Sequence, residues 1–360
     1  MQDRTKNIIV TIGFVFILML VFLINIIVKD KEISVTERRK LASFPEVSIS
    51  KLLKGEITSK FENYAVDQFV GRDTFRTVKA FYSTNIYKQK DNNNLFEKDG
   101  AIYKMEYPLS ETNIKKSAQK INEVYNTYLK DMNVYYAIIP DKNYYLENDN
   151  HLKFNYDELK EIMESELTNF KYIDIWSSLD LEDYYKTDIH WRQENLHEIV
   201  SAIQLNMNLN KTKNNYVVCD VGNFYGTYYG QITGNFEPDK MYILINDTLN
   251  NCTTYNYETG ETGNIYDEKT TQDKYDIYLS GATPIISIEN KNANTDKELL
   301  LFRDSFGSSL APLLVENYSK ITLIDLRYIS SKMLGQFIEF EDQDVLFLYS
   351  TVVLNQNILK

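Results

Sequence analysis

The segment from Ile8 to Val28 limits the folds open to this chain more than any other stretch. Its residues, IIVTIGFVFILMLVFLINIIV, include no charged side chain. About 20 consecutive apolar residues are enough to cross the hydrocarbon core of a bilayer as an α-helix, and helices of a soluble core are seldom apolar on every face over that length. A cleaved signal peptide has a shorter apolar region and a small-x-small cleavage site. We therefore expect residues 1–30 to be an uncleaved anchor that crosses the membrane through residues 8–28.

The charges that flank this segment do not decide its orientation. Arg4 and Lys6 precede it, and a larger basic group follows it: Lys29, Lys31, Arg38, Arg39 and Lys40. Topology depends on which side carries more Lys and Arg close to the membrane, and here both sides carry some. The charges alone therefore allow the main domain to lie on either face of the membrane.

The composition excludes some kinds of partner. With 360 residues and 43% hydrophobic content, the chain can form one large domain or two modest ones. The formal net charge is −12, whereas nucleic-acid binding depends on Lys and Arg that neutralise phosphates, so we expect no nucleic-acid partner. Cys219 and Cys252 could pair in an oxidising compartment or remain free thiols, and the sequence favours neither.

Beyond the anchor, the sequence indicates two further parts. Residues 31–97 are polar, and apolar residues at three- and four-residue steps predict a helical, membrane-proximal segment. Residues 98–360 alternate between helical and strand-like patterns. At about 214–275 the pattern changes to short alternating pieces interrupted by glycine, which predicts a β-rich antiparallel insertion.

The alternation in residues 98–360 predicts the fold class. Amphipathic helices are expected at 114–130 and 157–170, each followed by a short apolar strand, at 134–140 and 172–175. More apolar strands follow, at 298–302, 320–326 and 344–350. Short apolar strands separated by amphipathic helices indicate βαβ units. We therefore predict an α/β fold with a mostly parallel sheet flanked by helices.

The stretch LLLFRDSFGSSLAPLL, residues 299–314, places charged and hydroxyl side chains where a buried strand meets a helix. In an open α/β sheet, ligands bind outside the carboxyl ends of the strands, and Ser305 occupies that position. Gly307 permits a sharp turn, and the N–H groups at the start of the helix could stabilise an oxyanion. Ser305 is thus a candidate nucleophile, supported by Arg303, Asp304, Phe306 and Gly307. The alternative is an ordinary helix start capped by Asp304, and the reserve nucleophiles are Ser308 and Ser309.

A serine nucleophile needs a base that a third group orients. Of the three histidines, His151 lies in a polar loop, His197 lies in a helical segment, and His190 follows Asp188 by two residues. In an extended segment this spacing points both side chains to one side, with Trp191 as a wall of the site. The alternative makes Asp188 a helix N-cap and His190 a first-turn residue. No HExxH pattern or third ligand accompanies the histidines, so we expect no metal site.

Two blocks, TDIHW (187–191) and RDSFGSSLAP (303–312), together resemble the DHHW family of bacterial membrane-anchored proteins. That family is similar to the SGNH hydrolase-like group that includes the alginate O-acetylation proteins. Other segments look like parts of the family: ERRKLASFP (37–45), FENYAVDQFVGRD (61–73), IIPDK (138–142), YDIYLSGATPIISIEN (275–290) and LRY near Arg327. The resemblance covers nearly the whole chain outside the anchor and implies an SGNH hydrolase-like fold.

The sequence departs from the family signature at one position, because Ile189 stands where the second letter of DHHW calls for histidine. The resemblance implies a triad of Asp188, His190 and Ser305. In ordinary SGNH hydrolases the serine block comes first, whereas here the Asp-x-His pair precedes the serine. The acetylation proteins share this order, which by analogy favours a transferase.

The resemblance therefore implies a membrane-anchored, extracytoplasmic O-acetyltransferase that acts on a cell-surface or secreted polysaccharide through an acetyl-serine intermediate. No cofactor is required, and a separate membrane-bound protein would supply the acyl groups. Tyr225, Tyr228 and Tyr229 could stack on sugars or could simply pack the sheet. An acetyl-esterase with the same triad and a non-catalytic polysaccharide-binding scaffold remain alternatives.

Overall fold

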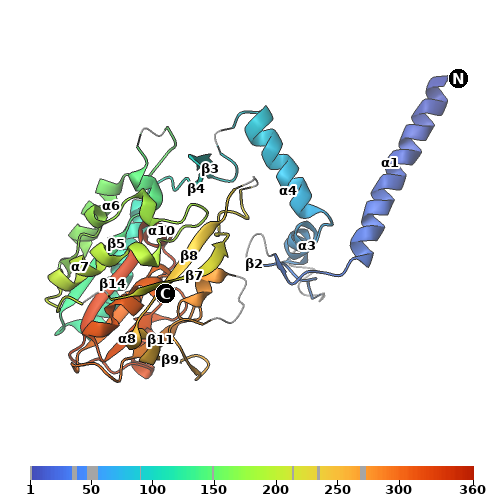
Figure 1. Ribbon diagram of the computed structural model, residues 1–360. Helices are drawn as coiled ribbons and strands as arrows, with labels where there is room; N and C mark the ends of the chain where they lie inside the picture. The colour runs from blue at the N-terminus through green and yellow to red at the C-terminus, as the bar shows by residue number, and fades with distance from the viewer. Residues whose placement is uncertain are drawn as a thin grey trace. The chain divides into compact units, whose positions relative to one another are not determined.

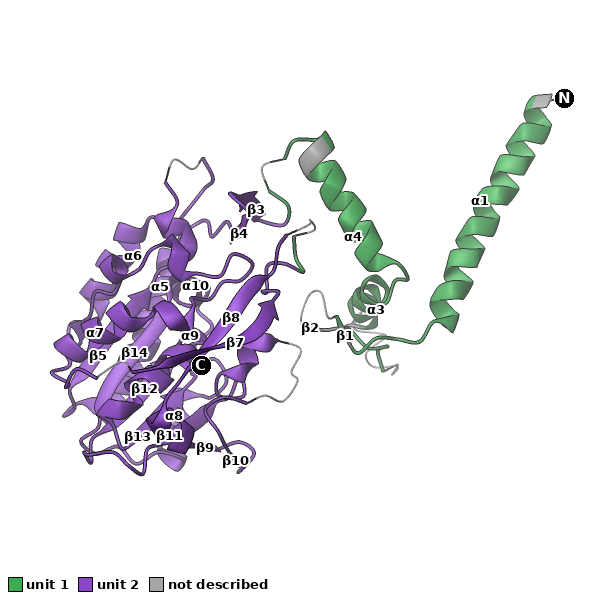
Figure 2. Cartoon of the chain, viewed as in Figure 1, with its two compact units in different colours: residues 1–92, 230–235 green, residues 93–229, 236–360 purple. Residues whose placement is uncertain are grey.

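A computed structural model of the chain describes residues 2–34, 39–46, 56–89, 91–147, 150–212, 215–232, 236–267 and 273–360. The chain divides into two compact units, which are coloured separately in Figure 2. Unit 1 comprises residues 1–92 and 230–235, and unit 2 comprises 93–229 and 236–360. The first boundary between the units falls near residue 92, and residues 1–92 belong to one unit. Part of the family-like segment at 37–45, residues 37 and 38, lies outside the described residues.

Unit 1 is mainly helical (Figure 1). Its helices are α1 (Gln2–Ile27), α3 (Glu56–Asp67) and α4 (Arg72–Phe81), and a π-helical turn (Tyr82–Ile86) continues α4. Two short strands, β1 (Ile33–Ser34) and β2 (Arg39–Lys40), pair antiparallel. Residues Asp3–Ile27 of α1 are long and apolar enough to cross a membrane, and the most apolar window has a mean hydropathy of 2.9 with no buried residue. The expected apolar N-terminal helix, long enough to serve as a membrane anchor, is therefore present.

Unit 2 contains an eight-stranded sheet in the order β10-β9-β11-β13-β12-β14-β5-β6. The strands are β5 (Val134–Ile139), β6 (Lys171–Tyr172), β9 (Thr253–Asn256), β10 (Thr262–Gly263), β11 (Ile285–Glu289), β12 (Glu298–Arg303), β13 (Lys320–Ile324) and β14 (Asp344–Ser350). The run from β13 to β6 is parallel, and β10, β9 and β11 form an antiparallel edge. The helices are α5 (Glu111–Val124), α6 (Tyr156–Glu166), α7 (His197–Asn206), α8 (Asp247–Asn251), α9 (Phe306–Leu310) and α10 (Thr351–Gln356). The predicted α/β class with a mostly parallel sheet is confirmed.

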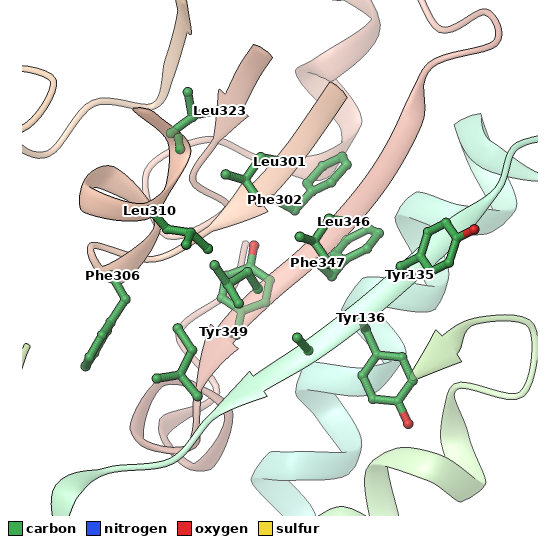
Figure 3. Close-up of a cluster of buried hydrophobic side chains, with 14 of the residues drawn as sticks. Tyr135, Tyr136, Leu301, Phe302, Phe306, Leu310, Leu323, Leu346, Phe347 and Tyr349 are labelled. Atoms are coloured by element: carbon green, nitrogen blue, oxygen red, sulfur yellow. The ribbon is translucent and has the colours of Figure 1, made fainter. Parts of the chain in front are cut away.

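The central strands are apolar along their length because helices and loops cover both of their faces. All six residues of β5 are buried, as are Leu299–Arg303 of β12. Phe302 of β12 and Phe347 of β14 are register partners whose rings stack at 4.3 Å, in the core shown in Figure 3. This packing fixes the place where β12 ends and the chain turns into α9.

The region 214–275 only partly forms a separate β insertion. Strands β7 (Val217–Phe224) and β8 (Asp239–Ile245) pair as an antiparallel two-stranded sheet with an irregularity between Asp220 and Gly222. The following strands, β9 and β10, instead extend the edge of the main sheet. Residues 214, 233–235 and 268–272 of this region lie outside the described part of the chain. A further hairpin of β3 (Leu95–Lys98) and β4 (Ala101–Lys104) begins unit 2.

Candidate active site

Ser305 lies just beyond the carboxyl end of β12, between the parallel neighbours β13 and β14. Every residue from Leu299 to Val315 is buried except Ser305, which is partly exposed. The sequence therefore brings one hydroxyl to the surface from an otherwise buried strand and helix. This is the position at which open α/β sheets bind ligands.

The turn around Ser305 leaves its hydroxyl free of a capping role. The carboxylate of Asp304 accepts hydrogen bonds from the N–H of Phe306, at 3.1 Å, and from the N–H of Ser350, at 2.8 Å. Asp304 thus satisfies one of the donors that a helix start leaves unpaired, and the Ser305 side chain makes no capping bond. Gly307 serves close packing, because a Cβ there would lie 2.6 Å from Cβ of Arg303.

The loop that carries Asp188 and His190 is a tight reversal and neither a strand nor a helix start. Tyr184 and Trp191 form an isolated antiparallel bridge, and the N–H of Tyr185 donates to the carbonyl of His190 at 3.1 Å. Helix α7 begins only at His197, so the alternative in which Asp188 caps a helix is wrong. The reversal still places both side chains on one side, because Oδ1 of Asp188 accepts from the N–H of His190 at 2.9 Å.

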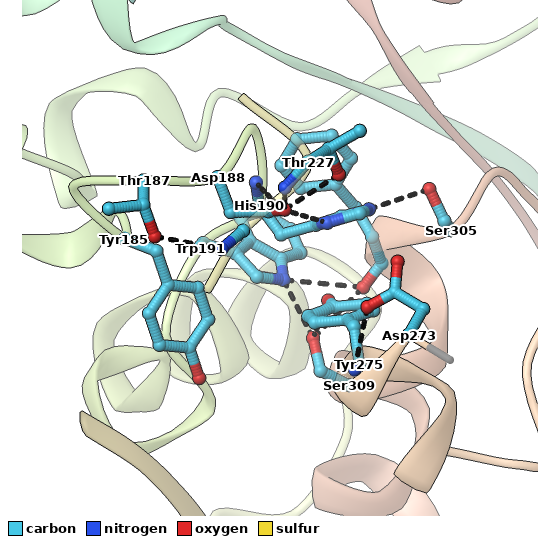
Figure 4. Close-up of polar contacts among 12 residues, drawn as sticks. Tyr185, Thr187, Asp188, His190, Trp191, Thr227, Asp273, Tyr275, Ser305 and Ser309 are labelled. Carbon is cyan, nitrogen blue, oxygen red and sulfur yellow. Dashed lines mark hydrogen bonds and ion pairs between the residues drawn. The ribbon is translucent and has the colours of Figure 1, made fainter. Parts of the chain in front are cut away.

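Asp188, His190 and Ser305 form a continuous row of hydrogen bonds (Figure 4). His190 Nδ1 lies 2.5 Å from Asp188 Oδ1, and His190 Nε2 lies 2.7 Å from Ser305 Oγ. A carboxylate can only accept, so Nδ1 carries the hydrogen and Nε2 of the neutral ring accepts from the serine hydroxyl. This arrangement can remove the proton from Ser305 as its oxygen attacks an electrophile.

The second oxygen of Asp188 is held from another part of the chain. The backbone N–H and the hydroxyl of Thr227 donate to Oδ2 at 2.5 and 2.7 Å. Burial acts to raise the pKa of Asp188, but His190 and the N–H donors of Thr227 and His190 outweigh it and hold the pKa below its usual range. The carboxylate is therefore ionised and oriented at neutral pH.

Two buried charged side chains, Lys142 and Asp239, hydrogen-bond to the loop that carries Asp188 and His190. The ammonium of Lys142 donates to the carbonyls of Tyr185, Lys186 and Asp188 at 2.9, 3.1 and 2.9 Å. Three acceptors match the three N–H bonds of a protonated lysine. Burial lowers the pKa of Lys142 to about 7, and the nearby carboxylates of Asp188 and Asp239 oppose that shift.

Asp239, at the start of β8, holds the same loop from the hairpin. Its carboxylate accepts from the N–H of Lys186 and from the N–H and hydroxyl of Thr187, at 2.9, 2.8 and 2.6 Å. It also pairs with Arg192 at 3.0 Å. The β7–β8 hairpin therefore helps to shape the loop that carries Asp188.

An aromatic side chain lies flat on the imidazole. The ring of Tyr275 stacks on His190 with centroids 3.9 Å apart and an interplanar angle of 12°. Its hydroxyl is 2.8 Å from Oγ of Ser309, which also accepts from the indole N–H of Trp191 at 2.9 Å. Sequence spacing does not reveal four residues of this site, because each is far from its partners along the chain: Tyr275, Thr227, Lys142 and Asp239.

Several of the residues expected at the site are buried, and their side chains bond to other parts of the protein. Ser308 and Ser309 are buried, and Ser309 already bonds to Trp191 and Tyr275, so neither reserve nucleophile is accessible. Arg303 is buried and pairs with Asp325 at 3.5 Å. Trp191 is fully buried behind the imidazole, where its indole bonds to α9.

The three tyrosines expected to stack on sugars differ in exposure. Tyr228 is buried, with the ammonium of Lys142 5.2 Å from the centre of its ring, so of its two expected alternatives the packing role fits and sugar stacking does not. Tyr225 is 43% exposed and its ring lies 4.7 Å from that of Tyr229. This aromatic pair lies within two residues of Thr227 and hence close to Asp188.

The remaining candidates do not assemble a metal or disulfide site. The ring of His151 stacks on Phe96 at 3.6 Å, and His197 starts α7. Within the described ranges, no group of three or more His, Cys, Asp or Glu residues could hold a metal ion. Cys219 and Cys252 are both free.

No protein-family model matches the chain, and no curated protein does. Several solved structures are similar to it. A DHHW family protein from Eubacterium siraeum has a TM-score of 0.62 at 20% identity, covering 74% of this chain and 95% of that one. PatB1 of Bacillus cereus has a TM-score of 0.59 at 21% identity, and the match covers 75% of this chain and 98% of PatB1. A second structure, of PatB1 with a sulfonyl adduct, has a TM-score of 0.58 at 20% identity, and the match covers 72% of this chain and 97% of that one. The resemblance to the DHHW family is thus confirmed at the level of the fold.

Proposed function

We propose that the chain is a membrane-anchored, extracytoplasmic O-acetyltransferase that acetylates a cell-surface or secreted polysaccharide through Ser305. One observation carries the proposal, namely the row of hydrogen bonds from Asp188 through His190 to the partly exposed Ser305. A serine with this base and this orienting carboxylate is the arrangement that acyl transfer requires.

In the proposed first half-reaction, Nε2 of His190 takes the proton from Ser305 as Oγ attacks the carbonyl carbon of an acetyl ester. The tetrahedral intermediate collapses when the donor alcohol leaves with that proton, and acetyl-Ser305 remains. In the second half, a sugar hydroxyl passes its proton to Nε2 and attacks the acetyl carbon, and Ser305 leaves and takes the proton back. Asp188 stabilises the imidazolium in both halves.

The oxyanion donor that we propose is the backbone N–H of Ser305. The other two N–H groups expected for this role already have acceptors, since Phe306 donates to the Asp304 carboxylate and Gly307 donates to the Asp304 carbonyl, both at 3.1 Å. An N–H at the nucleophile itself points toward the oxygen that becomes negative in the intermediate.

The acceptor that we propose is a polysaccharide. The exposed Tyr225, whose ring contacts that of the partly buried Tyr229, supports it, because aromatic faces bury the apolar faces of sugar rings. The acetyl donor would be a separate membrane-bound protein, and α1 would hold the enzyme beside it on the extracytoplasmic side. No step in this chemistry requires a cofactor.

Covalent labelling of the full chain in detergent tests the nucleophile. The protein is incubated with phenylmethanesulfonyl fluoride and, separately, with p-nitrophenyl acetate, and its intact mass and modified peptide are measured. A sulfonyl reagent suits the site because activated serines react with it, and the similar PatB1 structure holds a sulfonyl adduct. Wild type and a Ser177→Ala control should gain one group, whereas Ser305→Ala and His190→Ala should gain none.

Adding acceptor oligosaccharides separates the remaining functions. Acetylated sugar supports the transferase, whereas free acetate at an unchanged rate identifies the esterase instead. A correctly folded wild type that gains no group from either reagent contradicts acyl chemistry at Ser305. In that case a non-catalytic polysaccharide-binding scaffold replaces the proposal.

A further inference from the structure

Helix α4 exposes its apolar face and buries its arginine-bearing face, whereas a helix on a water-soluble unit does the opposite. Residues 72, 76 and 80 share one face, and on it Ala80 is buried while the side chains of Arg72 and Arg76 are only 17% and 20% exposed. The opposite face, at the same helical spacing, is apolar and exposed: Phe75 62%, Val78 46% and Tyr82 51%. A helix that turns its apolar face outward requires an apolar environment on that side.

The start of α4 is fastened to the end of α1. Between α3 and α4 the chain turns at Gly71, which has a φ of 77°. Just before the turn, the N–H of Val70 donates to Oδ1 of Asn25 in α1 at 2.9 Å. Gln68 exchanges two hydrogen bonds with the backbone of Lys31, each of 2.9 Å. Residues 68–71, the elbow between α3 and α4, are therefore tied to the membrane-exit end of α1.

These contacts set the depth of the elbow relative to the membrane. Asn25 comes three residues before Val28, where the apolar segment ends, and at a rise of 1.5 Å per residue it lies about 4.5 Å inside that end. At this depth a backbone N–H has little access to water and needs a protein acceptor, which Asn25 supplies. The elbow thus lies at the boundary between hydrocarbon and headgroups.

The side chains at the elbow suit that boundary. The rings of Phe69 and Phe75 contact each other edge to face, with centroids 5.8 Å apart, and they are 39% and 62% exposed. Because hydrogen bonds tie the elbow to the end of α1, the exposed apolar face of α4 begins next to the bilayer that α1 crosses.

We propose that α4 is a membrane-interface helix. Phe69 and Phe75, followed by Val78 and Tyr82, insert into the headgroup and acyl-chain boundary of the bilayer that α1 spans. Interfacial amphipathic helices bury an apolar face in this way, and arginine side chains on the other face reach water or other polar groups. A lipid surface is the occupant because the elbow is fastened at the depth of that surface. The inference rests on α1 as a membrane span and is independent of the chemistry of Ser305.

Tryptophan fluorescence of the full chain in lipid nanodiscs tests this inference. Phe75→Trp places a reporter on the apolar face, and Thr77→Trp is the matched control, because Thr77 is exposed on the same helix and two residues turn it by about 200°. The native Trp176 and Trp191 are buried and provide a constant background. Each variant is measured with brominated lipids, which quench from within the bilayer, and with iodide, which quenches from water.

The two quenchers give distinct outcomes. If the inference holds, brominated lipid quenches most of the added fluorescence of Phe75→Trp, and iodide does not quench it. The added fluorescence of Thr77→Trp should be quenched by iodide and not by brominated lipid. Quenching of Phe75→Trp by iodide alone means that the face is in water and overturns the proposal. Shielding from both quenchers means that protein covers the face, and this also overturns it. Val78→Trp repeats the measurement if the first variant does not fold.

Discussion

Replacing Gly226 by alanine should disable the site although no residue of the Asp188–His190–Ser305 row is changed. Gly226 packs directly on the loop that carries Asp188. A Cβ at this position would lie 2.2 Å from the carbonyl oxygen of Thr187 and 2.4 Å from Cβ of Asp188. Non-bonded heavy atoms normally stay about 3.5 Å apart, and neither neighbour is the flexible end of a side chain. The loop would have to retreat by about 1 Å.

The hydrogen bonds across this contact give the magnitude. Thr187 accepts two hydrogen bonds: its hydroxyl from the N–H of Gly226 and its carbonyl from the N–H of Tyr228. Thr227 donates two more to the carboxylate of Asp188. Each is worth about 1 kcal/mol net, so losing two of them costs about 2 kcal/mol. For a unit of this size, that lowers the melting temperature by about 4–8 °C. A misplacement of about 1 Å can also slow catalysis by about 100-fold.

The assay is the initial rate of Ser305 labelling by a sulfonyl fluoride, measured with the melting temperature of each variant. Gly335→Ala is the matched control. A Cβ there would lie 3.3 Å from ring atom Cε1 of Tyr128, a contact that a small shift relieves. Gly335→Ala should therefore behave like wild type in both measurements. A Gly226→Ala protein that labels and melts like wild type would refute the idea that this close contact positions Asp188.

Substitutions at three further positions probe the residues that support the imidazole. Asp188→Asn should slow serine labelling by about 10⁴-fold, because an amide does not hold the ring of His190 in the reactive tautomer. The pKa of Asp188 is held below its usual 3.8, so the stability that it contributes is present above about pH 4 and is lost as the pH falls. In urea unfolding, the stability difference between wild type and Asp188→Asn should shrink from about pH 5 to about pH 2, and a constant difference would contradict this. Tyr275→Phe should keep the ring stack and lose only the bond to Ser309, whereas Tyr275→Leu should label about tenfold more slowly; equal rates would remove Tyr275 from the site. Lys142→Met removes three hydrogen bonds to the loop that carries Asp188, so it should lower both the melting temperature and the labelling rate. An unchanged labelling rate would contradict the idea that Lys142 positions this loop.

Local sequence patterns were sufficient to predict those helices and strands whose formation depends on residues that are neighbours in the sequence. The uncharged run 8–28 became α1, and the apolar runs 134–140, 298–302 and 344–350 became strands of the parallel part of the sheet. A buried strand shows its burial in its own composition, and a membrane span shows its environment in the same way. The expected helix after Ser305 is short, because α9 gives way to a 3₁₀ segment at Ala311–Asn317, whose second residue, Pro312, has no N–H to donate.

Burial of individual polar residues could not be predicted in this way. Tyr228 and Tyr225 stand in one glycine-rich stretch with the same local pattern, yet Tyr228 is buried and Tyr225 is exposed. Ser309 lies four residues from Ser305, but it faces Trp191 and Tyr275 and not the surface. Such differences depend on which side chains from distant segments fill the space around each residue.

By itself, the sequence determined the apolar N-terminal helix and the α/β class, and it pointed to the three residues of the proposed site. Asp188 and His190 are two residues apart, and Ser305 follows a recognisable strand, so their chemistry is visible locally. Only the tertiary structure decided that these groups meet, at 2.5 and 2.7 Å, and what holds them there. Lys142, Thr227, Asp239 and Tyr275 come from four separate segments. Their contacts follow from how the sheet and the hairpin pack, and no local spacing records that packing.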